Sequence, residues 1–160
     1  MKKDEIDTPA LLIDLDLMEK NIRNMSEYLK GKKAKLRPHV KNHKIPTIAR
    51  KEIEAGAVGV AVAKVSEAEV MAWGGIKDIL ITNQIVTDRK IARLVNLAKY
   101  CDLSVAVDNL DNIKQLSNAA AQKGVELGVV VEVDVGHHRA GVNPGKDAVP
   151  LARSVQVSKG

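Results

Sequence analysis

The sequence predicts an α/β fold in which strands alternate with helices and pair in a parallel sheet. Short apolar runs of strand length alternate with longer segments whose apolar residues recur every three or four positions. Glycine-bearing segments separate most of them. Phe is absent, Trp occurs once and Tyr twice, so the core is aliphatic, as buried parallel strands favour. Strict alternation of this kind implies βαβ crossovers between neighbouring strands.

The first 32 residues differ from the rest. Residues 10–16, ALLIDLD, follow a proline and predict a strand. Residues 17–30 carry apolar residues at helical spacing and predict a helix that ends at Gly31. We therefore expect residues 1–32 to form a leading strand and helix, and residues 33–160 to form a repeating part.

The repeating part predicts five strand–helix units. The predicted strands are residues 34–40, 58–63, 78–82, 103–107 and 127–134, and the helices that follow them are residues 45–55, 66–73, 88–100, 109–123 and 148–155. Both an open doubly wound sheet and an eight-stranded barrel use this alternation. A closed barrel usually needs about 250 residues, and this chain has 160. Two architectures stay open: a small open α/β domain, or the first portion of an incomplete (β/α)8 barrel.

The bulk composition excludes several classes of protein. The net charge is +5 and the pI is about 9.3, but basic and acidic residues are interleaved and aromatic residues for base stacking are scarce, so we expect no nucleic-acid partner. Cys101 is the single cysteine, which fits a reducing compartment. The start, MKKDEIDTP, lacks the apolar segment of a signal peptide, and no apolar run is long enough for a bilayer. We expect a soluble, cytoplasmic protein without a membrane partner.

Polar residues gather where the predicted strands end. They are His39, Lys41, Asn42 and His43, then Lys64, then Thr82, Asn83 and Gln84, then Asp108, and finally Glu132, Asp134, His137, His138 and Arg139. Parallel α/β folds bind ligands at the carboxyl ends of their strands. The sequence therefore predicts a site at this end.

In the stretch LRPHVKNHK, Lys41 is the strongest candidate for a reactive residue. It follows Val40 at a predicted strand end, where partial burial and the nearby cations Arg37, His43 and Lys44 would disfavour an ammonium ion. A neutral amine is the nucleophile that forms a Schiff base with an aldehyde. From the residues alone, a solvated surface lysine is the commoner alternative.

The other candidates carry less information by themselves. His39 and His43 are four residues apart but not on a predicted helix, and His137 and His138 are adjacent, so we expect no metal site from either pair. Arg139, in VGHHRAGVNPG, can donate forked hydrogen bonds to an anionic oxygen. A surface arginine is an equal alternative.

Three stretches carry a resemblance to a known family. DTPALLIDLDLMEKNIRNM, RPHVKNHK and EVDVGHHRAGVNPG resemble, in the same order, the N-terminal half of the D-threonine aldolase and D-serine dehydratase group. These enzymes share the alanine racemase-like fold, in which a (β/α)8 barrel binds pyridoxal 5′-phosphate (PLP) and a β-rich second domain completes the site. Asn42 stands where the group usually has Thr, and the two residues before Arg139 also depart from the commoner pattern.

The resemblance implies roles for particular residues. Lys41 would form the Schiff base with PLP, and Arg139 would face the phenolic oxygen of the cofactor. His39 and Gln84 are expected as further neighbours of the cofactor. A divalent metal, Zn or Mn, would be held by ligands that this chain does not contain.

The resemblance also implies a function and an assembly. We expect a PLP-dependent lyase that cleaves or dehydrates β-hydroxy-D-amino acids, with a homodimer as its full-length form. The alternatives are an amino-acid racemase and a non-catalytic PLP-binding protein of cofactor homeostasis. The segment at residues 10–16 argues against the last, because in the two-domain enzymes it belongs to the β-rich domain. We expect the 160-residue chain to be a partial and inactive enzyme, since an unclosed barrel exposes two sheet edges.

Overall fold

The computed structural model describes residues 2–160 and has the predicted alternation of helices and parallel strands. After a short 3-10 helix, η1 (Lys3–Glu5), the elements are α1 (Leu15–Leu29), α2 (Pro46–Glu54), β1 (Val60–Val62), α3 (Val65–Trp73), β2 (Asp78–Ile81), α4 (Asp88–Leu97), β3 (Asp102–Val107), α5 (Leu110–Lys123), β4 (Gly128–Val131) and α6 (Ala148–Val157). No helix within residues 2–160 is both long and apolar enough to cross a bilayer.

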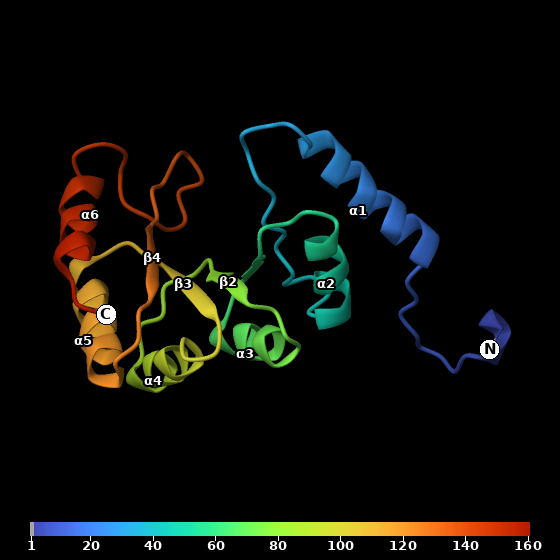
Figure 1. Ribbon diagram of the computed structural model, residues 1–160, viewed down its shortest axis with the longest axis horizontal. Helices are drawn as coiled ribbons and strands as arrows, with labels where there is room; N and C mark the ends of the chain where they lie inside the picture. Colours follow the sequence, from blue (N-terminus) through green and yellow to red (C-terminus); the bar gives the residue numbers. More distant parts are fainter. Residues whose placement is uncertain (1) are drawn as a thin grey trace.

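The order of the strands distinguishes the two architectures left open by the sequence. The four strands lie in the order β1-β2-β3-β4, and each pairs in parallel with the next along the chain. A doubly wound sheet reverses its strand order at a switch point, and this sheet does not. In Figure 1 the helices α2 to α6 follow one another around the outside of the sheet. Both features are those of consecutive units of a (β/α)8 barrel.

The two faces of the sheet differ in burial because only one carries helices. Ile79 and Ile81 on β2 are fully buried, whereas Leu80 between them is partly exposed. The register places Leu80 in one row with Ala61, Ser104 and Gly128 on the inner face. The core therefore lies between the sheet and the outer helices.

Residues 34–40 form an extended segment beside β1 instead of the regular strand that the sequence predicts. The only bridge within it joins His39 to Ala61 in parallel. Backbone hydrogen bonds run from Val58 N–H to the Leu36 carbonyl and from Ala61 N–H to the Pro38 carbonyl. Pro38 has no N–H to contribute to a ladder, which explains why pairing stays incomplete.

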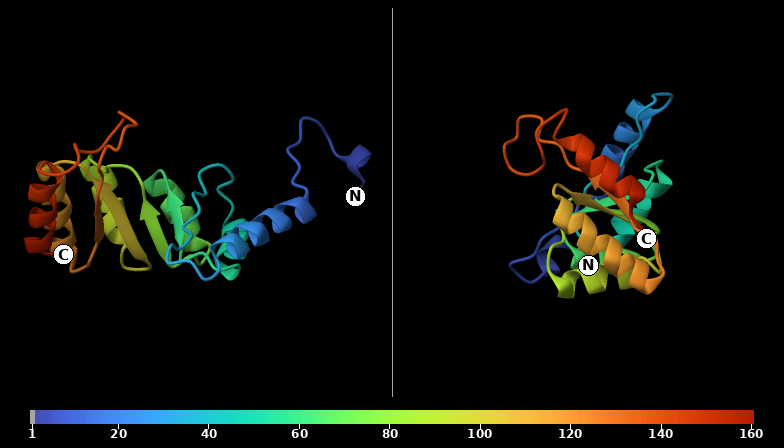
Figure 2. Two further views of the ribbon diagram at one scale, coloured as in Figure 1. Left: turned by 90° about the horizontal axis from the view of Figure 1, so that it is seen from above. Right: turned by 90° about the vertical axis from the view of Figure 1, so that its left-hand side faces the viewer.

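The strand predicted at residues 10–16 does not form. Residues 10–14 are extended but unpaired, and α1 already begins at Leu15, because the Asp14 side chain accepts the N–H of Leu17 and caps the helix. Leu11 is 97% exposed, and the left view of Figure 2 shows the N-terminal segment projecting away from the sheet. An extended segment becomes a strand only beside a partner, and residues 2–160 supply none here.

An ion pair occupies the inner face at the amino end of the sheet. Arg37 donates from both terminal nitrogens to Asp78, at 2.6 and 3.0 Å. The two side chains meet over Gly59, where a Cβ would lie 2.5 Å from Arg37 Nη1 and from the Asp78 carbonyl oxygen. Arg37 is therefore committed to Asp78 at the amino end of the sheet, and the expectation that it acts as a cationic neighbour of Lys41 is wrong.

Gly59→Ala should destabilise the protein by about 3 kcal/mol, because the added methyl overlaps the ion pair and backbone that meet at this position. Gly145→Ala is the control: its φ is +83° but a Cβ there meets open space, so about 1 kcal/mol is expected from backbone strain alone. Urea unfolding measures both losses. Equal losses in the two variants would contradict the packing role of Gly59.

Candidate active site

The segment that carries Lys41 leaves the sheet in a tight turn anchored at both sides. Val40 is fully buried, and its N–H donates to the Ala61 carbonyl at 2.9 Å. The chain then turns, and Lys44 N–H donates back to the Val40 carbonyl at 2.8 Å with Lys44 at a φ of +55°. Lys41 itself is exposed. The turn thus presents Lys41 at the carboxyl end of the sheet, directly after a buried anchor.

His39 lies between Lys41 and the neighbouring strands. Its Nδ1 accepts the N–H of Lys41 at 3.3 Å, and its Nε2 lies 3.2 Å from the Thr82 hydroxyl oxygen, just beyond β2. Burial lowers the pKa of His39, the Lys41 charge lowers it further, and Glu67 acts in the opposite direction. His39 is therefore placed beside Lys41, and its neutral form is favoured.

Glu67 is a buried carboxylate behind the same turn. It accepts the N–H of Ala63 at 2.8 Å, at the end of β1, and lies 4.0 Å from Lys44 Nζ. Its side chain is only 7% exposed. Sequence reasoning missed this residue, although a carboxylate in the first turn of a helix after a strand is a usable signal.

His43, on the other side of Lys41, is also partly buried. Its Nδ1 accepts the N–H of Ile45 at 3.0 Å, and its Nε2 lies 3.8 Å from a Glu52 oxygen. Burial lowers the pKa of His43 and raises the pKa of Glu52. The histidines that bracket Lys41 therefore each accept the backbone N–H two residues further on.

Gln84 joins the ends of two strands. Its side-chain amide donates to Glu132, after β4, at 2.6 Å. The neighbouring Asn83 donates instead to the Ala63 carbonyl at 2.8 Å and so links the end of β2 to β1. Gln84 also lines a cavity of about 230 Å³ beside the starts of α3 and α4. Polar groups from β1, β2 and β4 thus meet along one edge.

The loop after β4 is organised by Asp134. One carboxylate oxygen accepts the N–H groups of Gly136, His137 and His138, at 2.9, 2.9 and 3.0 Å, and the other lies 3.2 Å from His138 Nδ1. The hydrogen bonds from the His138 and Gly136 backbone lower the pKa of Asp134. Arg139 extends from this loop and is exposed.

The predicted residues fall into two groups at the carboxyl end. His39, Lys41 and Thr82 are in direct contact, and Gln84 is linked to Glu132. Arg139 has no hydrogen bond or ion pair to another part of residues 2–160. Within the same residues no carboxylate pairs with Lys41 Nζ, and no three His, Cys, Asp or Glu side chains cluster as metal ligands.

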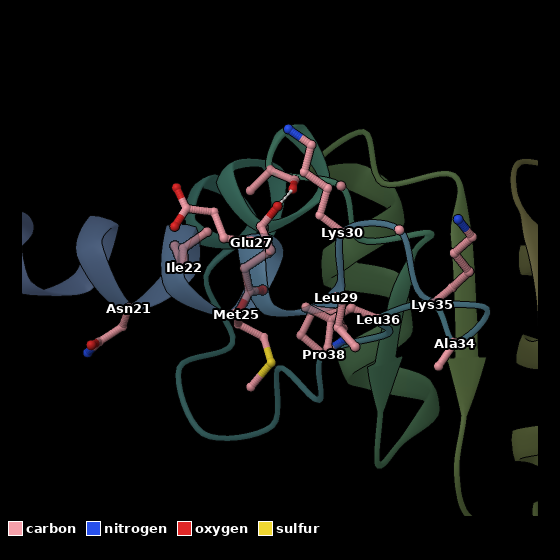
Figure 3. Close-up of a pocket in the computed structure, with 15 residues that line it drawn as sticks. Asn21, Ile22, Met25, Glu27, Leu29, Lys30, Ala34, Lys35, Leu36 and Pro38 are labelled. Atoms are coloured by element: carbon pink, nitrogen blue, oxygen red, sulfur yellow. Dashed lines mark hydrogen bonds between the residues drawn. The ribbon is translucent and has the colours of Figure 1, made fainter.

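A large groove lies elsewhere on the described chain. It measures about 700 Å³ and separates α1 from residues 34–38. Ile22, Met25 and Leu29 line one side, and Leu36 and Pro38 line the other (Figure 3). None of the predicted site residues, His39, Lys41, Gln84 and Arg139, lines this groove. It is therefore not the candidate active site.

Comparison with known proteins assigns the family. The model of the family described as "Alanine racemase, N-terminal domain" matches residues 13–160. The chain belongs to this alanine racemase N-terminal domain family. The resemblance found in the sequence and the expected barrel-type α/β fold are both confirmed.

Three relatives of this family member are informative. The chain is 44% identical to a 3-hydroxy-D-aspartate aldolase of Paracoccus denitrificans, over 96% of this chain and 40% of the relative. It is 34% identical to a D-threo-3-hydroxyaspartate dehydratase of Delftia sp., over 94% and 39% of the two chains. The crystal structure of D-threonine aldolase from Filomicrobium marinum superposes with a TM-score of 0.94 at 44% identity, over 96% and 42%. The chain thus spans about 40% of the length of the curated relatives it matches.

Replacing Asp134 by Ala should open the loop that carries Arg139, because the amides of Gly136, His137 and His138 lose their shared acceptor. Hydrogen exchange at these amides near neutral pH should become faster, while Asp134→Asn, which retains one oxygen acceptor, should change it less. Asp111→Ala, at a side chain that is 91% exposed, is the control. Unchanged exchange in Asp134→Ala would contradict this role.

The same loop should loosen in acid. The pKa of Asp134 is lower in the folded chain than in the unfolded one. Its stabilisation is therefore complete above the ordinary pKa of an aspartate and is lost as the pH falls through the lowered value. Protection of the three amides, corrected for intrinsic exchange rates, should fall in that acid range in the wild type and stay flat in Asp134→Ala.

Proposed function

We propose that the protein is a PLP-dependent lyase that acts on β-hydroxy-D-amino acids, with Lys41 bound covalently to the aldehyde carbon of PLP. The observation that carries the proposal is the placement of Lys41. Its amine leaves the carboxyl end of a parallel sheet from an anchored turn, and within residues 2–160 no carboxylate holds it in an ion pair. A lysine committed to a salt bridge would be a poor nucleophile toward an aldehyde.

The residues around Lys41 fit the aldehyde end of PLP. Neutral His39 adds no positive charge beside the amine. Arg139 is an exposed guanidinium after β4 and would face the phenolic oxygen of the cofactor. Gln84, fixed by Glu132, is a further neighbour at the same edge. When bound, PLP draws electrons from the substrate Cα and so allows a bond there to break.

The protein's own contribution is to bind, orient and move a proton. With the substrate held at the cofactor, the Nζ of Lys41 would be free to act as a base for one face of the substrate. Arg139 stays charged at any working pH and therefore stabilises an anionic oxygen without competing for protons. Breaking Cα–Cβ of a β-hydroxy substrate is aldol cleavage, and removing the Cα proton with loss of the β-hydroxyl is dehydration.

The relatives support a lyase over the alternatives. 3-Hydroxy-D-aspartate, D-threonine and D-threo-3-hydroxyaspartate share a hydroxyl on Cβ, and the proteins that carry these names are 44%, 44% and 34% identical to this chain. A racemase needs no such hydroxyl. A non-catalytic PLP-binding protein would hold the cofactor without turning over any of these amino acids.

Several features of the whole protein belong to the same proposal. We infer that a divalent metal, Zn or Mn, takes part through ligands outside these 160 residues, that the working form is a homodimer, and that the protein is cytoplasmic. A soluble D-amino acid is its partner, with neither nucleic acid nor membrane involved.

Lys41→Ala should abolish covalent attachment of PLP. The protein is mixed with PLP, reduced with borohydride and digested, and the modified peptide is identified by mass spectrometry. We expect the label on Lys41 in the wild type and in the control Lys99→Ala, and no stable visible absorbance of lysine-bound PLP in Lys41→Ala. Retention of that absorbance in Lys41→Ala would assign the attachment to another lysine.

The products distinguish the possible reactions. With D-threonine, aldol cleavage gives glycine and acetaldehyde; with D-serine, dehydration gives pyruvate and ammonia. We expect one of these product pairs from the PLP-loaded protein in its full-length form. Conversion of a D-amino acid to its L-enantiomer, without either product pair, would instead establish a racemase.

A further inference from the structure

The hydrogen bonds around His39 determine which of its nitrogens carries the proton. The Thr82 hydroxyl donates to the Val62 carbonyl, at 3.1 Å, so its oxygen is left to accept a hydrogen bond from His39 Nε2 at 3.2 Å. His39 Nδ1 accepts the N–H of Lys41 and therefore carries no proton. These contacts form a hydrogen-bond chain in which every donor is used once: Lys41 N–H donates to His39, His39 Nε2–H to Thr82, and Thr82 O–H to Val62.

Protonation of His39 would break this hydrogen-bond chain. A second proton on Nδ1 would face the Lys41 N–H, so that two donors would meet. The charged groups that act on the ring are Lys41, from its own segment, and Glu67, from α3. Burial and Lys41 together favour the neutral ring over the opposing effect of Glu67. The neutral state is thus the one that the surrounding contacts require.

We propose that His39 is a positioning residue for Lys41, whose neutral ring ties the backbone at Lys41 to Thr82 and so fixes the point at which the lysine leaves the sheet. His39 then exchanges no proton with the substrate, because both of its ring nitrogens are engaged by the protein. This role rests on the proposed attachment of PLP to Lys41, and it concerns the rate at which that bond forms.

The test measures how fast Lys41 reacts with PLP. The neutral Nζ attacks the aldehyde carbon, a C=N bond forms and water leaves; borohydride then supplies hydride to the carbon and fixes the adduct. Peptide mapping gives the labelling rate of Lys41 and, in the same sample, of Lys99, which is exposed in the turn after α4 and serves as the internal control.

Two substitutions separate the two ring nitrogens. His39→Asn keeps an acceptor close to the position of Nδ1, and His39→Gln places its amide near Nε2 and leaves the Lys41 N–H without an acceptor. We expect labelling of Lys41 to fall roughly 5- to 10-fold in His39→Gln, the size of one hydrogen bond, and to stay within about 2-fold of wild type in His39→Asn. Lys99 should react equally in all three proteins.

If His39→Gln does not fold, two substitutions of Thr82 test the same hydrogen-bond chain from its other end. Thr82→Val removes the acceptor of Nε2–H and should slow Lys41 labelling, whereas Thr82→Ser retains the hydroxyl and should not. Equal Lys41 rates in wild type and His39→Gln, or equal losses in His39→Asn and His39→Gln, overturn the positioning role. Absence of label from Lys41 in the wild type overturns the proposed function instead.

Discussion

The parallel pairing of residues 36–40 with β1 is the constraint on which the candidate site depends. Hydrogen bonds from Val58 to Leu36, from Ala61 to Pro38 and from Val40 to Ala61 fix the register of this segment against β1. Side chains alternate along an extended chain, so this register puts His39 on the inner face with its bridge partner Ala61. A shift of one residue would exchange the buried Val40 for His39 and move the site to the helix-covered face.

The alternation of elements could be predicted from the sequence because each element carries its own local signal. Helices α2 to α6 and strands β1 to β4 all begin within two residues of their predicted starts. The exceptions are the two segments whose structure depends on a neighbour. Residues 10–14 are as apolar as a strand but have no partner strand within residues 2–160, and residues 34–40 pair only in part because Pro38 interrupts the ladder.

The candidate site was only partly predictable, because spacing along the chain does not reveal contacts between strands. Lys41 could be selected since it follows a strand directly, and its role came from the resemblance. The contact of His39 with Thr82 and that of Gln84 with Glu132 join residues 43 and 48 positions apart. Arg37 shows the reverse error: it is close to Lys41 in sequence, but its guanidinium binds Asp78 at the other end of the sheet.

The polar residues at the carboxyl end divide by what they bind. Asn83 and Asp134 hold backbone groups of the protein, and Gln84 holds Glu132, so the side-chain atoms that make these bonds already have partners and shape the edge of the sheet. Lys41, Lys64 and Arg139 differ, because within residues 2–160 their charged ends bind no side chain of opposite charge. A cationic group without a partner can bind an anionic ligand without first breaking an ion pair, and an unpaired amine that loses its proton can attack an electrophile. This difference leaves all three groups available, and among them the resemblance carried by RPHVKNHK and EVDVGHHRAGVNPG selects Lys41 and Arg139 for the proposed cofactor.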